Sequence, residues 1–510
     1  MSAFSAAFLS GDPRALAFLP DDFRYAEKRA ASIRRAAKRS IAAPVLEALR
    51  AQASRRPMTP ERLASLDALG QPGSVAVVTG QQVGLFLGPL YSFYKAASAV
   101  ISARALEHET GVRCVPVFWL QTEDHDVEEI DHLDVGEVRV RLQSPHVPRA
   151  SISELLLGDG VAAALSELRD ALGDAPNADE VLALFARHYR RECTWASAFA
   201  GVMSELLPSL VILDPRDEVL ARAVAGVHQR AFTECDAIAR VMLARQSALR
   251  DSGFDVQVHV RDGSPLSFVH PEGRSGPRFR VERCSEGWKC IGSEHVVSTV
   301  DPLRVSTSAL IRPVVQDTLL PTAAIIGGPG ELNYFAQVSP LYAHYGLDMP
   351  MVMPRARFRV LEPRVVTLLS KLGLQPHDLE HPRESVLQRL APVATELTPE
   401  VLERRLLDAI EPILESVPGL EDAVKRTRAT MARAANRLAG RYARSLRTHD
   451  ETVIGRVDRI QRSLFPHGEP QERVLGFPEF AARFGVDEFR QMVLSALVPF
   501  SYDVVTLGQR

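Results

Sequence analysis

The chain has 510 residues, a formal net charge of −3 and 46% apolar residues, which is an ordinary globular composition. This length exceeds what one hydrophobic core usually supports, so we expect two or three structural units. The small net charge excludes a global attraction to nucleic acid or to an anionic membrane, and we expect neither as a partner.

The N-terminus and the lack of a long apolar run predict a soluble, cytoplasmic protein. The first residues lack a basic segment and are interrupted by Pro13 and Pro20, unlike a signal peptide. No run approaches the ~18 apolar residues of a membrane span. The five cysteines are odd in number and form no CxxC pair, which argues against a disulfide framework and a zinc site.

Residues 1–70 have a helical, Ala/Arg-rich pattern and are expected to pack on the core that follows. From Ser74 onward, short apolar runs alternate with helical stretches. A helix is expected from about Val83 to Glu109. The apolar runs are SVAVVTG, CVPVFWL, LVILDP, TAAII and MPMVM. Continuous apolar strands between helices are typical of a parallel sheet covered on both faces, so residues 71–360 are predicted to form a doubly wound α/β core.

Two insertions are expected within this core. Residues 135–205 have a mixed, mainly helical pattern. Residues 254–295 contain the short runs FDVQVHV, SPLSFVH, RFRVER and GWKCIG, which predict a small antiparallel β insertion. Residues 217–252, between the insertions, are predicted to form one or two long helices.

Residues 361–470 are predicted to form a helical coiled-coil domain, and residues 471–510 to return to the core. Thr398 is a candidate N-cap, with Pro399 at the first helical position. A second helix should extend to about Arg462, with apolar residues recurring every seven positions. Two long helices joined by a short break favour an antiparallel coiled-coil hairpin.

Three predicted strands end in residues suited to chemistry, and the first of these ends is GQQVGLFLGPLYSFYK. Its glycines would let a backbone approach a ligand, and its glutamine side chains can donate and accept hydrogen bonds. An alternative is that two of the glycines, four residues apart, only allow close helix packing. No known phosphate-loop motif is present. The candidate binding residues are Gly80, Gln81, Gln82, Gly84, Gly88, Tyr91 and Lys95.

The second strand end, QTEDHDVEE, contains Glu123, Asp124, His125 and Asp126 in succession. These groups could form a metal site, a general acid/base pair or a solvated turn. Adjacent carboxylates repel, which tends to raise the pKa of one of them, and only His125 changes charge near neutrality. No second histidine cluster is in view, so no metal is predicted.

The third strand end is IIGGPGELNYF, a glycine-rich turn before a helix, which is suited to an anion or carboxylate. Its candidate residues, with two from the preceding helix, are Gly328, Gly330, Glu331, Asn333, Tyr334, Arg312 and Gln316. Because parallel strands bind ligands beyond their carboxyl ends, the three segments should meet in one cleft.

Taken together, TGQQVGLFLGPLYSFYKAAS, PVFWLQTEDHDVEEI and GGPGELNYFAQVSPLYAHYGLDMPMVMPR resemble the family of the bacillithiol-biosynthesis cysteine-adding enzyme, the cysteine ligase of that pathway. VSTSALIRPVVQD and PQERVLGF fit as well, and the resemblance extends from about residue 10 to the end. It implies a Rossmann-like core with connecting-peptide insertions, similar in plan to class I aminoacyl-tRNA synthetases, and a coiled coil that supports a homodimer.

The resemblance also implies a reaction, the last step in making the redox thiol bacillithiol. The carboxyl group of L-cysteine would be joined to the glucosamine amine of glucosaminyl malate. In this hypothesis His125, flanked by Asp124 and Asp126, is the general base, and Lys95 and Arg312 bind the malate carboxylates. Hydroxyls and the cysteine ammonium would be oriented by Gln81, Gln82, Glu331 and Tyr334, and Arg355 is a further candidate binding residue.

Forming an amide from a free carboxylate is uphill in water, so ATP is expected as the activator, from energetics and fold analogy. No HIGH or KMSKS sequence of the class I synthetases is present. An alternative is an adenylate-forming or nucleotidyl-transferring relative that acts on another amine or acid. A scaffold protein with a vestigial cleft is a further alternative.

Overall fold

The computed structural model describes residues 2–19, 21–390, 398–416 and 419–508, without the side chains of residues 388, 399 and 443–450. The chain divides into two compact units. The first is built from Met1–Arg359 and Glu472–Leu507, and the second mainly from Val360–Gln471. None of the helices described is long and apolar enough to span a bilayer.

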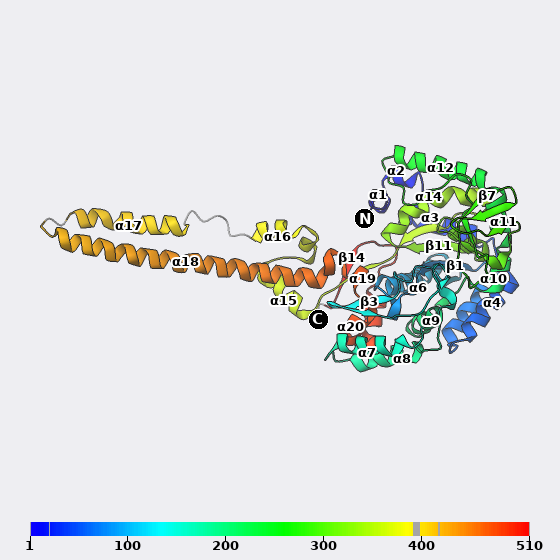
Figure 1. The fold of residues 1–510 in the computed structure, drawn as a ribbon, viewed down its shortest axis with the longest axis horizontal. Coiled ribbons are helices and arrows are strands. Elements are labelled where there is room, and N and C mark those ends of the chain that lie inside the picture. The colour runs from blue at the N-terminus through cyan, green and yellow to red at the C-terminus, as the bar shows by residue number, and fades with distance from the viewer. Residues whose placement is uncertain (1, 20, 391–397, 417–418, 509–510) are drawn as a thin grey trace. The chain divides into compact units, whose positions relative to one another are not determined.

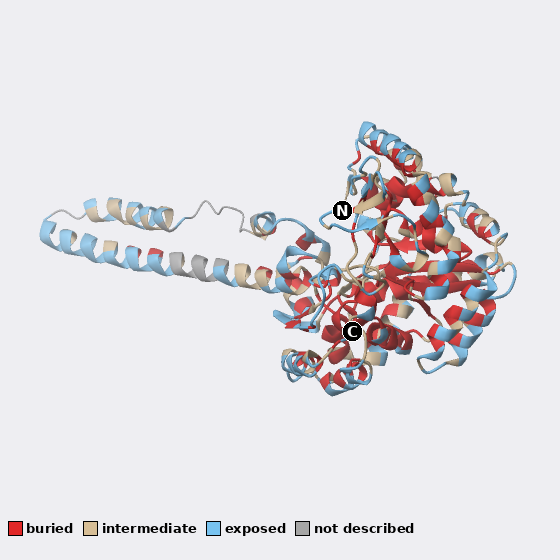
Figure 2. Cartoon of the chain, turned by 45° about the vertical axis from the view of Figure 1, so that its right-hand side comes forward, coloured by how far each residue is buried: buried red, intermediate tan, exposed pale blue. Residues whose placement is uncertain are grey.

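A five-stranded parallel sheet forms the centre of the first unit, which confirms the predicted α/β class. Its spatial order is β12-β11-β1-β2-β5. Most of its residues are fully buried, as expected for a sheet covered on both faces (Figure 2). The strands are β1 (Val75–Gln81), β2 (Cys114–Leu120), β5 (Val211–Leu213), β11 (Thr322–Gly327) and β12 (Met351–Pro354).

Successive strands are added on opposite sides of the central strand β1: β2 and β5 lie on one side, and β11 and β12 on the other. Figure 1 labels β1 and β11, the two neighbouring strands at this point. Helix α6 (Tyr91–Thr110) leads from β1 to β2, and α14 (Pro329–Tyr345) leads from β11 to β12 on the opposite side of β1. Because crossovers of this kind are right-handed, the two helices lie on opposite faces. The carboxyl ends of β1 and β11 therefore form a topological switch point, where open α/β sheets bind ligands.

The helix after β1 begins later than predicted. We expected it from about Val83, but α6 begins at Tyr91, after a short 3₁₀ turn. Phe86 and Leu87 have φ angles of 48° and 77°, and Gly88 has 63°, so the backbone leaves the helical region before Pro89. A pattern of apolar residues does not reveal this loop, because its apolar side chains are as buried as those of a helix.

The N-terminal residues form five short helices that belong to the first unit. Phe4, Leu49 and Leu66 lie in the same hydrophobic cluster as Val77 of the central strand. The helices are α1 (Ala3–Ser10), α2 (Pro13–Leu16), α3 (Ala26–Ala36), α4 (Ala43–Ser54) and α5 (Pro60–Leu69).

The first insertion is mixed and mainly helical, as predicted. It consists of a hairpin followed by three helices, and α20 (Phe477–Phe484) packs against its second helix, α8. Helix α21 (Val486–Ala496) follows α20. The elements of the insertion are β3 (His132–Val135), β4 (Val138–Arg141), α7 (Gly160–Leu172), α8 (Ala178–His188) and α9 (Trp195–Leu206).

The second insertion is a β region, but one of its four predicted strands is wrong. FDVQVHV is irregular, and side chains take the place of a neighbouring strand at Val258: Gln246 donates to the Val258 carbonyl over 2.9 Å, and Gln337 accepts from the Val258 N–H over 3.2 Å. The sequence prediction missed β10, which pairs with β6 and extends the β insertion from its predicted end at residue 295 to Thr307. The strands are β6 (Ser267–Val269), which pairs with β10 (Val305–Thr307), and the ladder β7 (Val281–Cys284), β8 (Gly287–Cys290) and β9 (Val296–Val297).

Residues 217–252 form three helices instead of one or two, because the chain leaves the helical conformation at Val224 and Glu234. They are α10 (Glu218–Ala223), α11 (Ala225–Thr233) and α12 (Cys235–Asp251). Helix α13 (Arg312–Leu319) then precedes β11.

The second unit contains the predicted helical hairpin. Helix α17 (Pro399–Glu415) packs along α18 (Glu421–Leu464), and the Thr398 hydroxyl caps α17 by accepting from the Val401 N–H over 3.2 Å. Both helices are mostly exposed in Figure 2. Helices α15 (Pro363–Leu372) and α16 (Arg383–Leu390) pack on the end of α18 around Val457 and Ile460.

A buried ion pair joins the C-terminal segment of the first unit to the end of β12. The Arg355 guanidinium donates to both carboxylate oxygens of Glu472, over 2.9 and 2.7 Å. The two side chains are only 3% and 6% exposed. Two parallel charge-assisted hydrogen bonds without competing water hold this connection in one geometry.

Replacing Glu472 by Gln should lower the free energy of unfolding by about 3–5 kcal/mol, because the Arg355 charge would stay buried without a counter-charge. Urea unfolding measures this change. The matched control is Asp67→Asn, which removes the exposed pair with Arg50 and should cost about 0–1 kcal/mol. Equal losses in the two variants would contradict the structural role of the buried pair.

Candidate active site

A cavity of about 670 Å³ opens at the carboxyl ends of β1, β2 and β11 in the first unit. All three predicted strand-end segments contribute side chains to it. The first provides Gln81 and Gln82, the second Glu123 and Asp124, and the third Glu331. The cavity therefore lies at the switch point of the sheet, where the fold places ligands.

Lys95 joins two walls of this cavity. Its side chain is 4% exposed, and its ammonium contacts Glu331 Oε2 at 2.5 Å, Gln81 Oε1 at 2.8 Å and the Gly80 carbonyl at 3.0 Å. Burial lowers the pKa of Lys95 despite the nearby Glu331 carboxylate. Three acceptors use all three N–H groups, so the predicted role of Lys95 in binding a malate carboxylate is not supported by this geometry.

Glu331 is fixed from both sides. Besides Lys95, its Oε2 accepts the Gly328 N–H over 2.8 Å at the start of α14. Burial alone would raise the pKa of Glu331, but Lys95 outweighs it and the pKa is lowered. Gly328 and Gly330 line the cavity beside this carboxylate.

Arg312 and Tyr334 line the cavity as predicted, whereas Gln316 and Asn333 do not. Gln316 is 1% exposed, and its Oε1 accepts from Arg312 Nη1 over 3.2 Å, so it orients the arginine from behind. Asn333 is also 1% exposed, and donates to the Asp255 carbonyl over 3.0 Å. The helical face that we expected to present Asn333 to a ligand is therefore turned into the core.

Tyr91 and Arg355 close one side of the cavity. The guanidinium carbon of Arg355 lies 5.9 Å from the centre of the Tyr91 ring, and the Tyr91 hydroxyl is 3.5 Å from Gln81 Nε2. Nη1 and Nη2 of Arg355 both donate to Glu472. The charge of this arginine is therefore already paired, and its side chain forms part of the cavity wall.

Three candidate glycines, Gly80 in β1 and Gly84 and Gly88 after it, pack against other backbone atoms and are not among the residues that line the cavity in the described part of the chain. A Cβ on Gly80 would lie 2.8 Å from the Trp119 carbonyl oxygen, and a Cβ on Gly84 would lie 2.9 Å from Gly88 Cα. Gly84 and Gly88 precede α6, so the alternative of close helix packing is wrong too. They let the loop fold onto itself before the helix begins.

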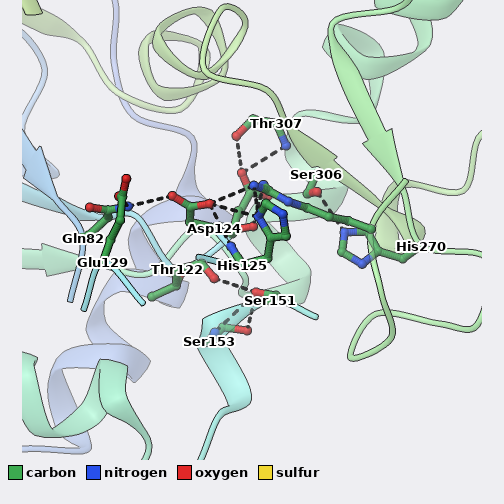
Figure 3. Close-up of polar contacts among 12 residues, drawn as sticks. Gln82, Thr122, Asp124, His125, Glu129, Ser151, Ser153, His270, Ser306 and Thr307 are labelled. Atoms are coloured by element: carbon green, nitrogen blue, oxygen red, sulfur yellow. Dashed lines mark hydrogen bonds and ion pairs between the residues drawn. The ribbon is translucent and has the colours of Figure 1, made fainter. Parts of the chain in front are cut away.

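Two consecutive acids at the end of β2 are held from different directions. Glu123 Oε2 accepts hydrogen bonds from both the N–H and the hydroxyl of Thr307, the last residue of β10. Asp124 Oδ2 accepts from Gln82 Nε2, and its Oδ1 accepts from the His125 N–H and from Arg278 Nη2, each over 2.8 Å (Figure 3).

These contacts determine the charge of Asp124. Burial would raise the pKa of Asp124, but the hydrogen bonds from the His125 N–H and Gln82 and the charge of Arg278 hold the pKa well below its usual range. The expectation that repulsion between adjacent acids raises a carboxylate pKa is therefore wrong for Asp124. Its carboxylate stays ionised at neutral pH.

His125 and Asp126 are not among the residues that line the cavity in the described part of the chain. The Nδ1 atom of His125 lies 2.7 Å from Arg278 Nη2, and Asp126 is exposed. The predicted arrangement, in which two aspartates flank a histidine base inside the cleft, is not what the structure shows. Asp124 alone of the three faces the cavity.

The sequence prediction missed residues that the second insertion brings to the cavity. Thr307, Arg278 and Phe268 all line it, although they lie 140 residues or more beyond Asp124. RFRVER was predicted only as a strand, and nothing in its local pattern marks Arg278 for a site. Within the described ranges, no group of three or more His, Cys, Asp or Glu side chains is arranged to hold a metal ion.

Two buried histidines contact β6 and β10, the strand pair that carries Thr307. His270 donates from Nδ1 to the Gly276 carbonyl over 3.0 Å, and its Nε2 lies 2.8 Å from Ser306 Oγ (Figure 3). His228 Nδ1 lies 2.8 Å from Ser267 Oγ. Burial lowers the pKa of each histidine to about 4, so both are neutral in the folded protein near neutral pH.

Two family models match the chain. Residues 2–356 match "Bacillithiol biosynthesis BshC, N-terminal Rossmann-like domain", and residues 358–505 match the C-terminal coiled-coil domain of the same family. Together the two matches cover nearly the whole chain.

Relatives in several bacteria are similar over most of their length, and each carries the name "Putative cysteine ligase BshC". The protein of Koribacter versatilis is 33% identical over 84% of this chain and 83% of its own. That of Solibacter usitatus is 32% identical over 87% of this chain and 89% of its own. That of Salinibacter ruber is 30% identical over 90% and 87%, respectively.

Acid should destabilise the fold through the two buried histidines. Between pH 6.5 and 4, both histidines are protonated in the unfolded chain and neutral in the folded chain. The free energy of unfolding therefore falls as the pH drops. The loss is about 1.4 kcal/mol per pH unit for each histidine. Urea unfolding at a series of pH values measures the slope.

The variant His270→Asn keeps a hydrogen-bond donor for the Gly276 carbonyl. It should reduce this slope by about 1.4 kcal/mol per pH unit, the contribution of one histidine. His108→Asn, at an exposed position on α6, is the control and should leave the slope unchanged. A slope that is the same in wild type and His270→Asn would contradict the assignment.

Proposed function

This chain belongs to the bacillithiol-biosynthesis BshC family, and on that premise we propose that its cleft joins the carboxyl group of L-cysteine to the glucosamine amine of glucosaminyl malate. The observation that carries the proposal is the charge distribution of the cavity. Carboxylates line one side of it at Glu123 and Asp124, and a guanidinium lines another at Arg312. An amino sugar that bears malate has an ammonium group, which the carboxylates would attract, and malate carboxylates, which the guanidinium would bind.

The acid wall suits the amine. Asp124 stays ionised because its pKa is held low, so it attracts an ammonium group and is a weak base. We assign proton removal to Glu123, whose Oε2 is fixed by Thr307 and whose carboxylate faces the same cavity. Loss of that proton turns the ammonium into the nucleophilic amine.

The basic wall suits the malate group. Arg312 is oriented by Gln316 and forms no ion pair in the described part of the chain. Its planar fork can hold one carboxylate in a bidentate geometry. This assigns to Arg312 the role that Lys95 cannot fill, since Lys95 is saturated by protein acceptors.

Carboxyl activation of cysteine requires a co-substrate, and we propose ATP. When bound, ATP would convert the cysteine carboxylate into an acyl group with a good leaving group. The cavity offers further cations for a polyanion: Arg261 and Arg280 also line it, and neither has an ion pair among the described residues. Backbone N–H groups at the start of α14 add to this positive potential.

The test incubates purified protein with glucosaminyl malate, L-cysteine and either ATP, GTP or no nucleotide, and detects the condensed thiol by mass. We expect the product only with cysteine, the amine and ATP together. Absence of product with every activator would refute the ligase assignment. Product with GTP alone, or without nucleotide, would refute the role of ATP and leave the ligase assignment standing.

Replacing Glu123 by Gln should lower kcat by about 100-fold or more, because the amide keeps the shape and loses the base. KM for cysteine should change little. The control is Glu109→Gln, at the far end of α6, which pairs with Arg29 outside the cavity. A kcat for Glu123→Gln within a few fold of wild type would show that the base is elsewhere.

A further inference from the structure

The inserted β region reaches the end of β2 at two points. Thr307 on β10 holds the Glu123 side chain. Arg278, just before β7, donates from Nη1 to the Glu123 carbonyl over 2.9 Å and from Nη2 to Asp124 Oδ1 over 2.8 Å. Its Nη2 also lies 2.7 Å from His125 Nδ1. One guanidinium therefore contacts Glu123, Asp124 and His125, three consecutive residues that we call the acidic segment.

We propose that Arg278 is a positioning residue, which fixes the Asp124 carboxylate for the substrate amine and holds His125 as the neutral tautomer with its proton on Nε2. The proposal rests on the proposed function only in its kinetic part. The tautomer is a property of the protein without substrate, so the two parts can fail separately.

The tautomer follows from the chemistry of the two groups. An arginine Nη always carries hydrogens and cannot accept a hydrogen bond. A protonated His125 Nδ1 at 2.7 Å from Arg278 Nη2 would place two N–H groups against each other. Nδ1 must therefore accept, and the single ring proton of the neutral histidine lies on Nε2. His125 Nδ1 is also 3.3 Å from Asp124 Oδ1, a contact that becomes a hydrogen bond only if Nδ1 is protonated.

Arg278 is itself held in place, as a positioning residue must be. Its side chain is 10% exposed, and its guanidinium carbon stacks 4.4 Å from the centre of the Phe268 ring on β6. Its backbone N–H donates to the Arg149 carbonyl over 2.8 Å. The next residue, Phe279, forms a backbone bridge with Val269 of β6. The guanidinium is thus carried by the β region and not by the acidic segment.

A different arrangement follows for a variant without this guanidinium. His125 Nδ1 loses its donor and can take a proton, which it would share with Asp124 Oδ1. Asp124 then turns from an acceptor for substrate into a partner for imidazolium. The change should weaken binding of the amine, and leave the binding of cysteine unaltered.

The first experiment measures ¹⁵N shifts of the histidine ring nitrogens in ¹⁵N-histidine-labelled full-length protein at pH 7–8, with His125→Gln to identify the His125 signals. We expect a pure Nε2–H tautomer in the wild type, and a mixture with Nδ1–H or imidazolium in Arg278→Met. The matched control is Arg283→Met, on β7 of the same insertion, where the arginine pairs with Asp236 and, in the described part of the chain, has no hydrogen bond or ion pair with the acidic segment. Its His125 signals should equal those of the wild type.

A wild-type His125 with its proton on Nδ1, or unchanged His125 signals in a folded Arg278→Met variant, would overturn the proposal. Circular dichroism shows whether the variant is folded. If Arg278→Met does not fold, Arg278→Lys replaces it: a single ammonium reaches fewer of the three acceptors and should give a partial shift in the same direction.

The kinetic experiment compares KM for each substrate. In Arg278→Lys, KM for glucosaminyl malate should rise about tenfold or more, with KM for cysteine within a few fold of wild type. Equal changes in both constants would indicate a general loss of structure and would overturn the positioning role. If the wild type forms no product at all, the proposed function fails while the NMR result still decides the tautomer.

Discussion

A buried ammonium group sets the geometry of the cavity. Lys95 lies almost without solvent between β1 and β11, so each of its three N–H groups needs an acceptor from the protein. Gly80 and Gln81 at the end of β1 supply two, and Glu331 at the start of α14 supplies the third. The two strand ends at the switch point are thereby tied together by one side chain. The carboxylate of Glu331 is anchored in turn by the backbone N–H of Gly328, the residue before its own helix.

The remaining wall is built on a different plan. Glu123 and Asp124 extend from β2, but the second insertion holds both of them, through Thr307 and Arg278. Acids that repel each other stay close together because cations and donors from another part of the chain offset the repulsion. The core sheet thus carries the two acids of the site, and the insertion supplies the donor and the cation that hold their carboxylates in place. A change in the insertion can alter substrate binding without any change in the sheet.

The fold could be predicted from the sequence to a large extent, because continuous apolar runs such as CVPVFWL have few structural solutions other than a buried parallel strand. The convergence of three strand ends followed from the same reasoning. The partners of each side chain could not be predicted. Lys95 was expected to bind substrate, yet burial among three acceptors leaves it no free hydrogen. Gly84 and Gly88 meet each other in a loop that an apolar pattern cannot distinguish from a helix. Arg278 has no local signal, since its role depends on a contact with a segment more than 150 residues away.

The central claim is that the amine substrate binds where β1, β2 and β11 end. Hydrogen exchange with and without glucosaminyl malate, followed by mass spectrometry of peptides, tests this most directly and needs no variant. We expect slower exchange in residues 80–91, 121–131 and 328–335 together. Slower exchange confined to residues 186–201, which line a separate cavity beside α8 and α9, would contradict it.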